Sequence, residues 1–542
     1  MKEKISCIKI RPGDHSLPGV TKTASGYNVT VTTPAAKCSL VLLRDGEETV
    51  IPMDAYACGD SRSILAEGPD MRKYRYAFRL EGFPEGSPCS DGLYGDIYAK
   101  RLCTEGGPRG VFAKTESASF DWKGDRFPRI PMKDAIVYEA HVKGFTKTAK
   151  TAFPGTFRGL QSRIGYLKAL GINALELLPV FEFDHLEPVF KHPETGEAVR
   201  NYWGYATTGF FAPKASYAAG KNPSAELKRL VRALHKNGIE LWLDVVFNHT
   251  GGKPEAPVLA AFGDYYLFKN GKPADLTGCG NTVACGRPEA LRFIVRCLEY
   301  WRSEYHIDGF RFDLCSVLAR NEKGENTHSS PLLSAINASP AVKGCKLIAE
   351  PWDAADGYRP GWFSANYRWS EWNDRFRDTL RSFLTGRDGA AAAMAECIAG
   401  SPGLFPKRPE ASVNFAACHD GFTLYDLFAY KEKHNEANGE NNRDGSDNNI
   451  SVNMGTEGPA DGETEKKRRR YAAAALALVL LSRGVPMLLM GDEVLRTKRG
   501  NNNTWCRDDE LSSLPWEQMK ARRDTLHLTK RLIALRKACP FA

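Results

Sequence analysis

The sequence predicts an α/β protein: an eight-stranded parallel (β/α)8 barrel, a TIM barrel, preceded by a small all-β sandwich. From residue 135 onward, short apolar runs alternate with helix-like stretches, which is the pattern of a parallel sheet whose connections are helices. Several of these runs lead into an acidic residue. Because the strands of such a barrel end on one face, these acids are expected to share a cleft.

Residues 8–110 follow a different pattern. Short alternating runs, such as 27–32, are separated by Gly, Pro and Asp, which is typical of the half-buried strands of a β-sandwich. Residues 111–133 are predicted as a linker, and residues 134–542 as the barrel domain.

The barrel strands are predicted from runs dense in Ile, Leu, Val, Phe and Trp. They are, in order, 135–140, 173–178, 239–243, 309–312, 347–349, about 367–372, 412–418 and 485–490. Helices are predicted where apolar residues recur every three or four positions. They are 160–170, closed by Gly171; a helix capped by Ser224 and closed by Gly238; 288–305, opened by Pro288; and about 525–537.

Length and charge narrow the class of protein. The 542 residues, 42% of them hydrophobic, suffice for a barrel and a second domain. The net charge is +9, and the one dense basic run, 466–470, precedes the short apolar stretch 471–481. A membrane span needs about 20 apolar residues, so a barrel helix with a solvated start is expected. Neither nucleic acid nor a membrane is an expected partner, and the sequence does not predict an oligomeric state.

The cysteines indicate a reducing compartment. The 14 cysteines include no CxxC pair, and several lie within apolar runs, so reduced thiols in a cytoplasmic protein are favoured over a disulfide framework. The first residues, MKEKISCIKIRPGDHS, contain no apolar segment of a secretory signal.

Two of the strand-end acids form the core of the predicted site. Asp313 ends the run GFRFD, and Arg311, two residues earlier, leaves the strand on the same face. A guanidinium favours the ionised carboxylate, the form that a nucleophile needs. Glu350, in IAEPWD, is the candidate general acid/base, whose pKa would be raised by neighbouring acids and an apolar wall. Such a pair is what glycoside hydrolysis requires.

Further polar residues are expected around this pair. Asp420, in CHDG, is a third candidate carboxylate beside His419, and DVVFNH contributes Asp244, Asn248 and His249. A metal site is the rival interpretation of these histidines and acids, although no HxH or HExxH spacing occurs.

No cofactor is expected. The Asn-rich segment 438–449 suggests calcium as an alternative, but EF-hand spacing is absent. A solvated, hydrogen-bonded loop is favoured there.

The motifs DVVFNHT, GFRFD, AEPW and HDG, in this order, resemble the four sequence regions of glycoside hydrolase family 13, the α-amylase superfamily. Within it, YEAHVKGFT, NYWGYATTGFFAP, EWNDRFRD, HNEANGENNRDG and GDEVLRTKRGNNN resemble the isoamylase and glycogen-debranching group. Residues 8–110 resemble the family 48 carbohydrate-binding module.

The resemblance implies a role for each matching residue. Three acids would be catalytic: Asp313 as nucleophile, Glu350 as acid/base and Asp420 as transition-state stabiliser. Six residues would contact or support the substrate: Arg311, which orients the nucleophile; His249, His419 and Asn248, beside the sugar; Tyr205, the aromatic platform beneath it; and Asp244, a mainly structural acid.

The activity that the resemblance implies is hydrolysis of α-1,6 branch linkages in glycogen, amylopectin or limit dextrins, with retention. A pullulanase, an α-1,4-hydrolase or a glucanotransferase of the same superfamily would use the same residues, and a catalytically idle glycan-binding protein is a further alternative. The superfamily usually has a C-terminal β-sandwich, whereas this sequence stops at Ala542. We therefore expect that domain to be absent, with the chain truncated or the barrel face exposed or covered by a partner.

Overall fold

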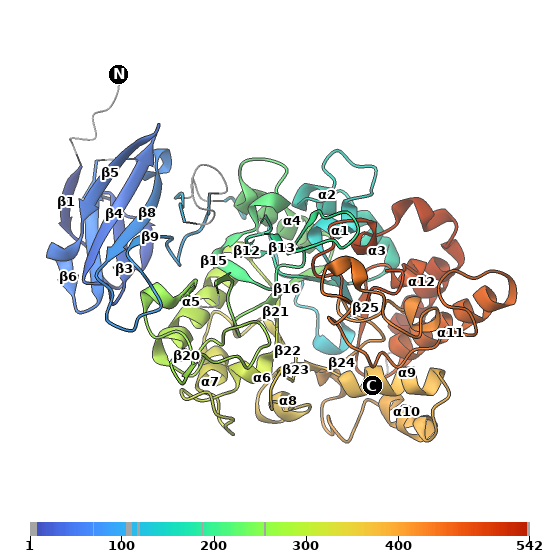
Figure 1. The fold of residues 1–542 in the computed structure, drawn as a ribbon. Coiled ribbons are helices and arrows are strands. Elements are labelled where there is room, and N and C mark those ends of the chain that lie inside the picture. Colours follow the sequence, from blue (N-terminus) through green and yellow to red (C-terminus); the bar gives the residue numbers. More distant parts are fainter. Residues whose placement is uncertain are drawn as a thin grey trace.

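The computed structural model describes residues 8–68, 70–103, 111–115, 120–186, 188–253 and 256–538. Figure 1 shows the N-terminal strands, in blue, as a lobe beside a barrel with its surrounding helices. The predicted domain boundary at residue 110 lies outside the described residues, as do linker residues 116–119 and the first seven residues of the chain.

The N-terminal strands form two antiparallel sheets. A five-stranded sheet has the order β1-β7-β3-β2 with β6 paired to β7, and a four-stranded sheet has the order β5-β4-β8-β9. The strands are β1 (Lys9–Pro12), β2 (Gly19–Lys22), β3 (Tyr27–Thr32), β4 (Lys37–Arg44), β5 (Glu47–Pro52), β6 (Ala57–Cys58), β7 (Ser61–Glu67), β8 (Arg75–Glu81) and β9 (Gly92–Tyr94). Alternate side chains, among them Val29, Leu40 and Phe78, are fully buried in a common core, as expected for a sandwich.

The N-terminal lobe contacts the barrel domain directly. The Thr33 hydroxyl donates to the Ala261 carbonyl at 2.7 Å, and the rings of Tyr94 and Phe262 meet edge to face at 6.4 Å between centroids. These contacts fix the lobe beside the loop that follows the third barrel strand.

Eight parallel strands close into the predicted barrel, with β25 pairing back to β10. The strands are β10 (Val137–Ala140), β11 (Ala174–Leu177), β16 (Glu240–Val245), β21 (Gly309–Phe312), β22 (Lys346–Ala349), β23 (Ser370–Trp372), β24 (Ser412–Asn414) and β25 (Val485–Leu489). Every strand residue except Lys346 is buried. Burial on both faces explains why these strands are continuous apolar runs in the sequence.

Helices connect the strands around the outside of the barrel. They are α1 (Val142–Thr146), α2 (Phe157–Gln161), α3 (Ile164–Leu170), α4 (Pro223–Lys236), α5 (Pro288–Tyr305), α6 (Cys315–Leu318), α7 (Pro331–Ala338), α8 (Trp362–Asn366), α9 (Asp374–Leu384), α10 (Ala390–Ile398), α11 (Gly462–Leu481) and α12 (Arg523–Ala538). Short hairpins lie in the loops: β12 (Phe181–Phe183) with β15 (Thr207–Pro213), β13 (Pro188–Lys191) with β14 (Ala198–Arg200), β17 (Gly252–Lys253) with β18 (Ala256–Pro257), and β19 (Phe268–Lys269) with β20 (Lys272–Pro273).

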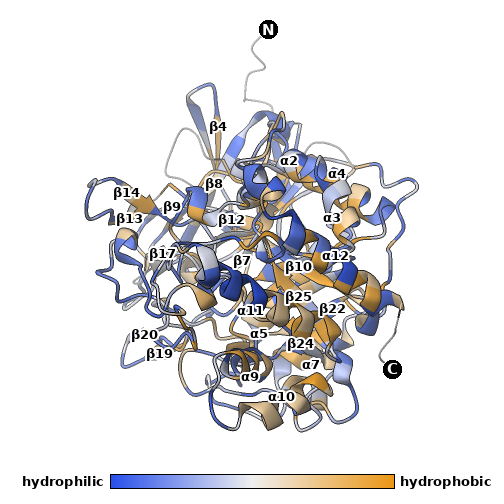
Figure 2. Ribbon diagram, turned by 90° about the vertical axis from the view of Figure 1, so that its right-hand side faces the viewer, coloured by the Kyte–Doolittle hydropathy of each residue, from blue (hydrophilic) through white to orange (hydrophobic). Residues whose placement is uncertain are grey.

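The interior of the barrel is apolar at its base. Its core contains Val137, Ala174, Trp242, Ile348, Val413, Val485 and Met487. Figure 2 shows the hydrophobic colour gathered on β10, β22, β24 and β25. Toward the carboxyl ends of the strands the buried side chains become charged, with Glu139, Glu176, Asp244 and Arg311. The barrel therefore holds charges deep beneath one face.

Three local predictions are wrong. The strand predicted to reach residue 418 ends at Asn414, so Asp420 lies on the following loop. Asp244 lies within β16 and not after it. The cap of α4 is Asn222, whose side chain accepts a hydrogen bond from the Ala225 amide at 2.9 Å, and not Ser224.

The basic run at 466–470 lies in the first half of α11, and the prediction that it is wholly solvated is wrong. Arg468 is fully buried and donates to the carbonyls of Gly458 and Asn453. No helix in the part of the chain that the structure describes is long and apolar enough to cross a membrane. The cysteines among the described residues are all free thiols.

Candidate active site

A cleft of about 740 Å³ lies at the carboxyl ends of the barrel strands, where barrel enzymes place their active sites. Six of the predicted site residues line it: Tyr205, His249, Asp313, Glu350, His419 and Asp420. The other three, Asp244, Asn248 and Arg311, are buried behind its wall. The structure thus brings the predicted residues together in one region.

Arg311 joins three of the acids. Its Nη1 donates to both oxygens of Asp244 at 2.9 Å and to Asp313 Oδ1 at 3.1 Å. Its Nη2 lies 3.0 Å from Glu350 Oε2. The guanidinium carbon is 4.1 Å from the ring centroid of the buried Trp372. Because a guanidinium presents its donors in a fixed plane, this one side chain sets the positions of all three carboxylates.

Asp313 is held through both of its oxygens. Arg311 binds Oδ1, and Asn248 Nδ2 donates to Oδ2 at 2.8 Å and to the Asp313 carbonyl at 2.9 Å. The carboxylate therefore has a fixed orientation toward the cleft.

His249 connects this acid to the opposite wall. Its Nδ1 lies 2.5 Å from Asn248 Oδ1, and its Nε2 lies 2.9 Å from the Tyr205 carbonyl. Burial opposes a charge on His249, but its hydrogen bond with Cys279 and the charge of Asp313 raise its pKa to about 9. A protonated ring can donate through both nitrogens at once, so His249 ties Asn248, which holds the nucleophile, to the backbone of Tyr205.

Glu350 has the environment of a proton donor. Burial raises the pKa of Glu350 to about 8, and the charge of Asp313 adds to this while Arg311 opposes it. Its Oε2 accepts a hydrogen bond from the Leu314 amide at 2.7 Å. Leu314 has a φ of 39°, a strained conformation for a non-glycine residue that is often found at functional sites. A carboxyl group with such a pKa keeps its proton near neutrality.

Tyr205 and His419 form an aromatic wall. The Tyr205 ring stacks on the His419 ring at 5.0 Å between centroids and 19° between planes, and its hydroxyl donates to Asp244 Oδ2. Trp203 meets His419 edge on at 4.9 Å. Burial raises the pKa of Asp244 to about 6, against the opposing charge of Arg311. The wall offers a flat apolar face to a sugar ring.

Asp420 differs from the other two acids because it is exposed. It lies on the loop after β24, where its carbonyl accepts a hydrogen bond from the Cys418 thiol at 3.2 Å. Asp420 nevertheless lines the same cleft as Asp313 and Glu350.

Other contributors to this site were missed from the sequence. Glu139, at the end of β10, accepts hydrogen bonds from His419, and Trp372 packs on Arg311. Lys498 donates to the His419 carbonyl at 2.6 Å, and burial lowers the pKa of its amine to about 8. Glu139 had a detectable signal, because it is an acid inside the apolar run 135–140. Trp372 and Lys498 lie in the motifs EWNDRFRD and GDEVLRTKRGNNN, but those motifs gave neither residue a role, since only the closed barrel brings them to this site.

No group of three or more His, Cys, Asp or Glu side chains among the described residues is arranged to hold a metal ion. In the Asn-rich segment 438–449, Asn438 Nδ2 donates to Asp444 Oδ2 and to the Asn503 carbonyl, both at 2.7 Å. The hydrogen bonding agrees with the prediction of a hydrogen-bonded loop, but Asn438 and Asn449 are buried, so the segment is not wholly solvated as predicted.

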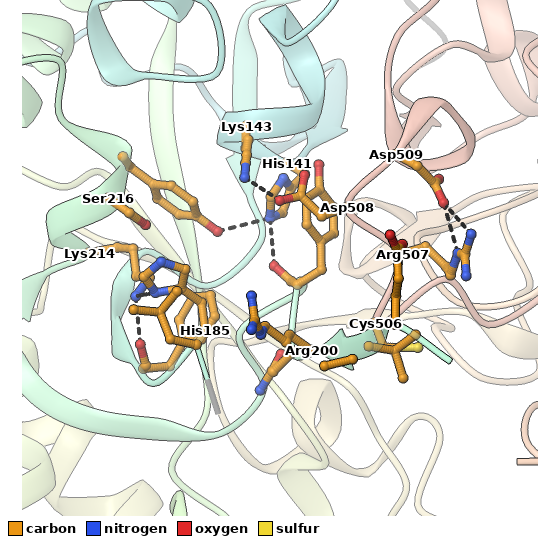
Figure 3. A pocket seen from close by; sticks show the side chains of 18 of the residues that line it. His141, Lys143, His185, Arg200, Lys214, Ser216, Cys506, Arg507, Asp508 and Asp509 are labelled. Atoms are coloured by element: carbon orange, nitrogen blue, oxygen red, sulfur yellow. Dashed lines mark hydrogen bonds and ion pairs between the residues drawn. The ribbon is translucent and has the colours of Figure 1, made fainter. Parts of the chain in front are cut away.

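A second pocket, of about 480 Å³, lies between α1, the β13–β14 hairpin and residues 506–509 (Figure 3). None of the nine predicted site residues lines it. Its charged side chains pair with one another: Lys143 with Asp508, and Arg507 with Asp509 at 2.6 Å. Burial lowers the pKa of His141 to about 3, so this ring is neutral. Asp508 and Asp509 are thus each neutralised by a basic neighbour, and the predicted catalytic acids lie in the other cleft.

Comparison with known proteins agrees with this geometry. Residues 112–278 match the family model described as the catalytic domain of alpha amylase. The chain is 38% identical over 523 residues to isoamylase 1, chloroplastic, of Arabidopsis thaliana, covering 87% of this chain and 67% of that protein. It is 37% identical over 579 residues to the glycogen debranching enzyme of Erwinia tasmaniensis, covering 98% of this chain and 85% of that protein.

Solved structures show the same likeness. The crystal structure of pullulanase type I from Bacillus subtilis str. 168, complexed with maltose, superposes with a TM-score of 0.76 at 27% identity. The match covers 97% of this chain and 72% of that chain.

Proposed function

The chain belongs to the α-amylase family of glycoside hydrolases, in the group of isoamylases and glycogen debranching enzymes, and we propose that it hydrolyses the α-1,6 branch linkages of glycogen, amylopectin or limit dextrins with retention. The observation that supports this activity best is the shared contact of Asp313 and Glu350 with Arg311. Retention needs a carboxyl separation of about 5–5.5 Å, and two carboxylates held by one guanidinium suit that short separation.

The reaction proceeds in two displacements. Asp313 attacks the anomeric carbon while Glu350 gives its proton to the bridging oxygen, so the glycosidic bond breaks and the main chain leaves with a free hydroxyl. A glycosyl ester on Asp313 remains. Glu350, now ionised, takes a proton from water, whose oxygen attacks the anomeric carbon and breaks the ester. The released branch keeps the α-configuration.

The surrounding residues support these steps. His419 donates to a hydroxyl of the sugar at the cleavage point, His249 lies beside the same sugar, and Asn248 fixes the nucleophile. Tyr205 lies beneath the apolar face of that sugar and excludes water. Asp420, at the open side of the cleft, accepts from sugar hydroxyls and stabilises the positive charge of the transition state.

The remaining assignments are parts of the same proposal. Residues 8–110 form a glucan-binding module, 111–133 a linker and 134–542 the catalytic barrel. No metal or cofactor takes part in either displacement. The enzyme acts in the cytoplasm, which the free thiols of the described cysteines support.

Product analysis on amylopectin beside unbranched amylose tests the activity. Linear chains released from amylopectin with amylose untouched are expected. Cleavage of amylose would assign an α-1,4-hydrolase, and rapid cleavage of pullulan would assign a pullulanase. If the protein cleaves neither amylopectin, amylose nor pullulan but still binds glycogen, it would be assigned as a glycan-binding protein.

A further inference from the structure

Tyr358 is a prominent feature of the cleft that the mechanism leaves without a role. Its side chain is 54% exposed, although it lines the same cleft as Glu350. The aromatic rings of Trp203 and Trp372 in this cleft are buried. A single exposed apolar residue on a convex surface needs no explanation, but an exposed ring inside a concave site is available to a ligand.

The turn before Tyr358 is firmly held. Asp353 Oδ1 accepts hydrogen bonds from the amides of Ala355 and Gly357, both at 2.9 Å, and its Oδ2 accepts from Arg320 at 2.6 Å. A Cβ atom on Gly357 would lie 2.2 Å from Asp353 Oδ2, so the close packing of this turn requires glycine.

The residue after Tyr358 is also anchored. The Arg359 amide donates to the Pro351 carbonyl at 2.7 Å. Its guanidinium donates to the Thr327 carbonyl at 2.9 Å and to Asn326 Oδ1 at 2.6 Å. With both neighbours fixed, Tyr358 projects from a preorganised turn, and little conformational entropy is lost when a ligand packs on its ring.

A buried acid lies beside this ring. Asp374, the first residue of α9, lines the same cleft as Tyr358 and lies close enough for the two side chains to interact electrostatically. Its side chain is largely buried, and its Oδ1 atom has no hydrogen-bond partner among the described residues. A buried acceptor without a partner is costly unless a ligand supplies the donor. Sugar hydroxyls are donors of this kind.

The position of Tyr358 in the chain indicates which part of the substrate it meets. Tyr358 follows Glu350 on the same loop after β22, whereas the Tyr205 and His419 wall comes from other elements. Because Glu350 protonates the bridging oxygen, its loop faces the leaving chain.

We propose that Tyr358 and Asp374 form a subsite for the glucan main chain, the leaving group of the reaction. The Tyr358 ring stacks on a glucose unit, and Asp374 Oδ1 accepts a hydrogen bond from a hydroxyl of that glucose unit. This subsite rests on the proposed debranching function and explains how the enzyme holds the chain that bears the branch.

The test compares two substrates that differ only in their leaving groups. The first is a branched dextrin with maltotriosyl branches, and the second is α-maltotriosyl fluoride, which has no leaving sugar. Tyr358→Ala is expected to lower kcat/KM on the dextrin about tenfold, mainly through KM, and to leave the fluoride unaffected. Tyr358→Phe keeps the ring and most of the activity, and Asp374→Asn raises KM on the dextrin only.

Phe383→Ala is the matched control, because Phe383 is 40% exposed on α9 outside the cleft. Phe383→Ala is expected to leave kcat/KM unchanged on both substrates. An equal loss on both substrates in Tyr358→Ala, or no loss on either, would overturn the subsite.

Binding separates this proposal from the activity on which it rests. The affinity of the same dextrin is measured by calorimetry in the Asp313→Asn background, with and without Tyr358→Ala. If the wild-type enzyme does not cleave the dextrin, the debranching function is refuted. A tenfold weaker affinity for the dextrin when Tyr358→Ala is added to Asp313→Asn would still support the subsite. An unchanged affinity would reject the subsite in either case.

Discussion

Glu139 of β10 holds His419 through two hydrogen bonds. Its Oε2 accepts from the backbone amide and its Oε1 from Nδ1 of the imidazole, both at 2.7 Å. Burial opposes a charge on His419, but the carboxylate of Glu139 outweighs it and raises the pKa of the ring. The first strand of the barrel thus fixes a side chain from the loop after the seventh.

Glu139→Gln is expected to lower the pKa of His419 and to weaken sugar binding. In the wild type, the pKa of His419 lies above its unfolded value of 6.5, so protonation of the ring stabilises the fold below pH 6.5. This stabilisation is lost as pH rises through the folded pKa. Glu139→Gln should lack this stabilisation, and its KM should begin to rise at a lower pH than the KM of the wild type. We expect kcat/KM to fall about ten- to a hundredfold. The pH profile of KM measures this, with the exposed Glu81→Gln as control, and an unchanged profile would contradict it.

Arg311→Lys is expected to destabilise the protein and abolish activity. An ammonium cannot reproduce the contacts of the guanidinium with Asp244, Asp313 and Glu350, so buried carboxylates lose their partner. Breaking a buried ion pair costs about 3–5 kcal/mol. Denaturant unfolding measures the loss, and Arg292→Lys on the surface of α5 serves as the control. Equal stabilities of the two variants would show that Arg311 does not organise the site.

Asp313→Asn is expected to abolish turnover while the fold remains intact. The amide has the same shape but cannot form the glycosyl ester, so kcat should fall on the order of 10⁴-fold or more. Release of reducing ends from amylopectin measures activity, and thermal unfolding checks the fold. Substantial residual activity in a purified sample would remove Asp313 from its role as nucleophile.

Glu350→Gln is expected to change the pH profile and the dependence on leaving group. The acid form is needed for the first displacement, so kcat/KM of the wild type should fall as pH rises through about 8. In Glu350→Gln, kcat/KM should no longer fall as pH rises through this range. α-Maltotriosyl fluoride, whose leaving group needs no proton, should retain far more activity than a branched dextrin. Equal losses on both substrates would argue against an acid role.

Several features of this protein follow from the sequence by itself. The alternation of apolar runs predicts the eight barrel strands, because a strand buried on both faces must be apolar throughout. The pairing of Arg311 with Asp313 also follows, since residues two apart in a strand share a face. The motifs around Asp313, Glu350 and Asp420 indicate the reaction class for the same local reason.

The tertiary structure alone decided the contacts between distant strands. Glu139 meets His419 because the barrel closes between β10 and β25. Trp372 of β23 packs on Arg311 of β21 because both side chains turn inward on either side of β22, and no local pattern records either contact. Asp420 is exposed on the loop after β24, although the five residues before it are buried. The proton affinity of Glu350 depends on burial and on the charges of Arg311, Asp313 and Asp244, which come from two other strands. Burial and the distances between charges are properties of the assembled fold. The sequence therefore predicts which acids form the site but not how their pKa values are shifted.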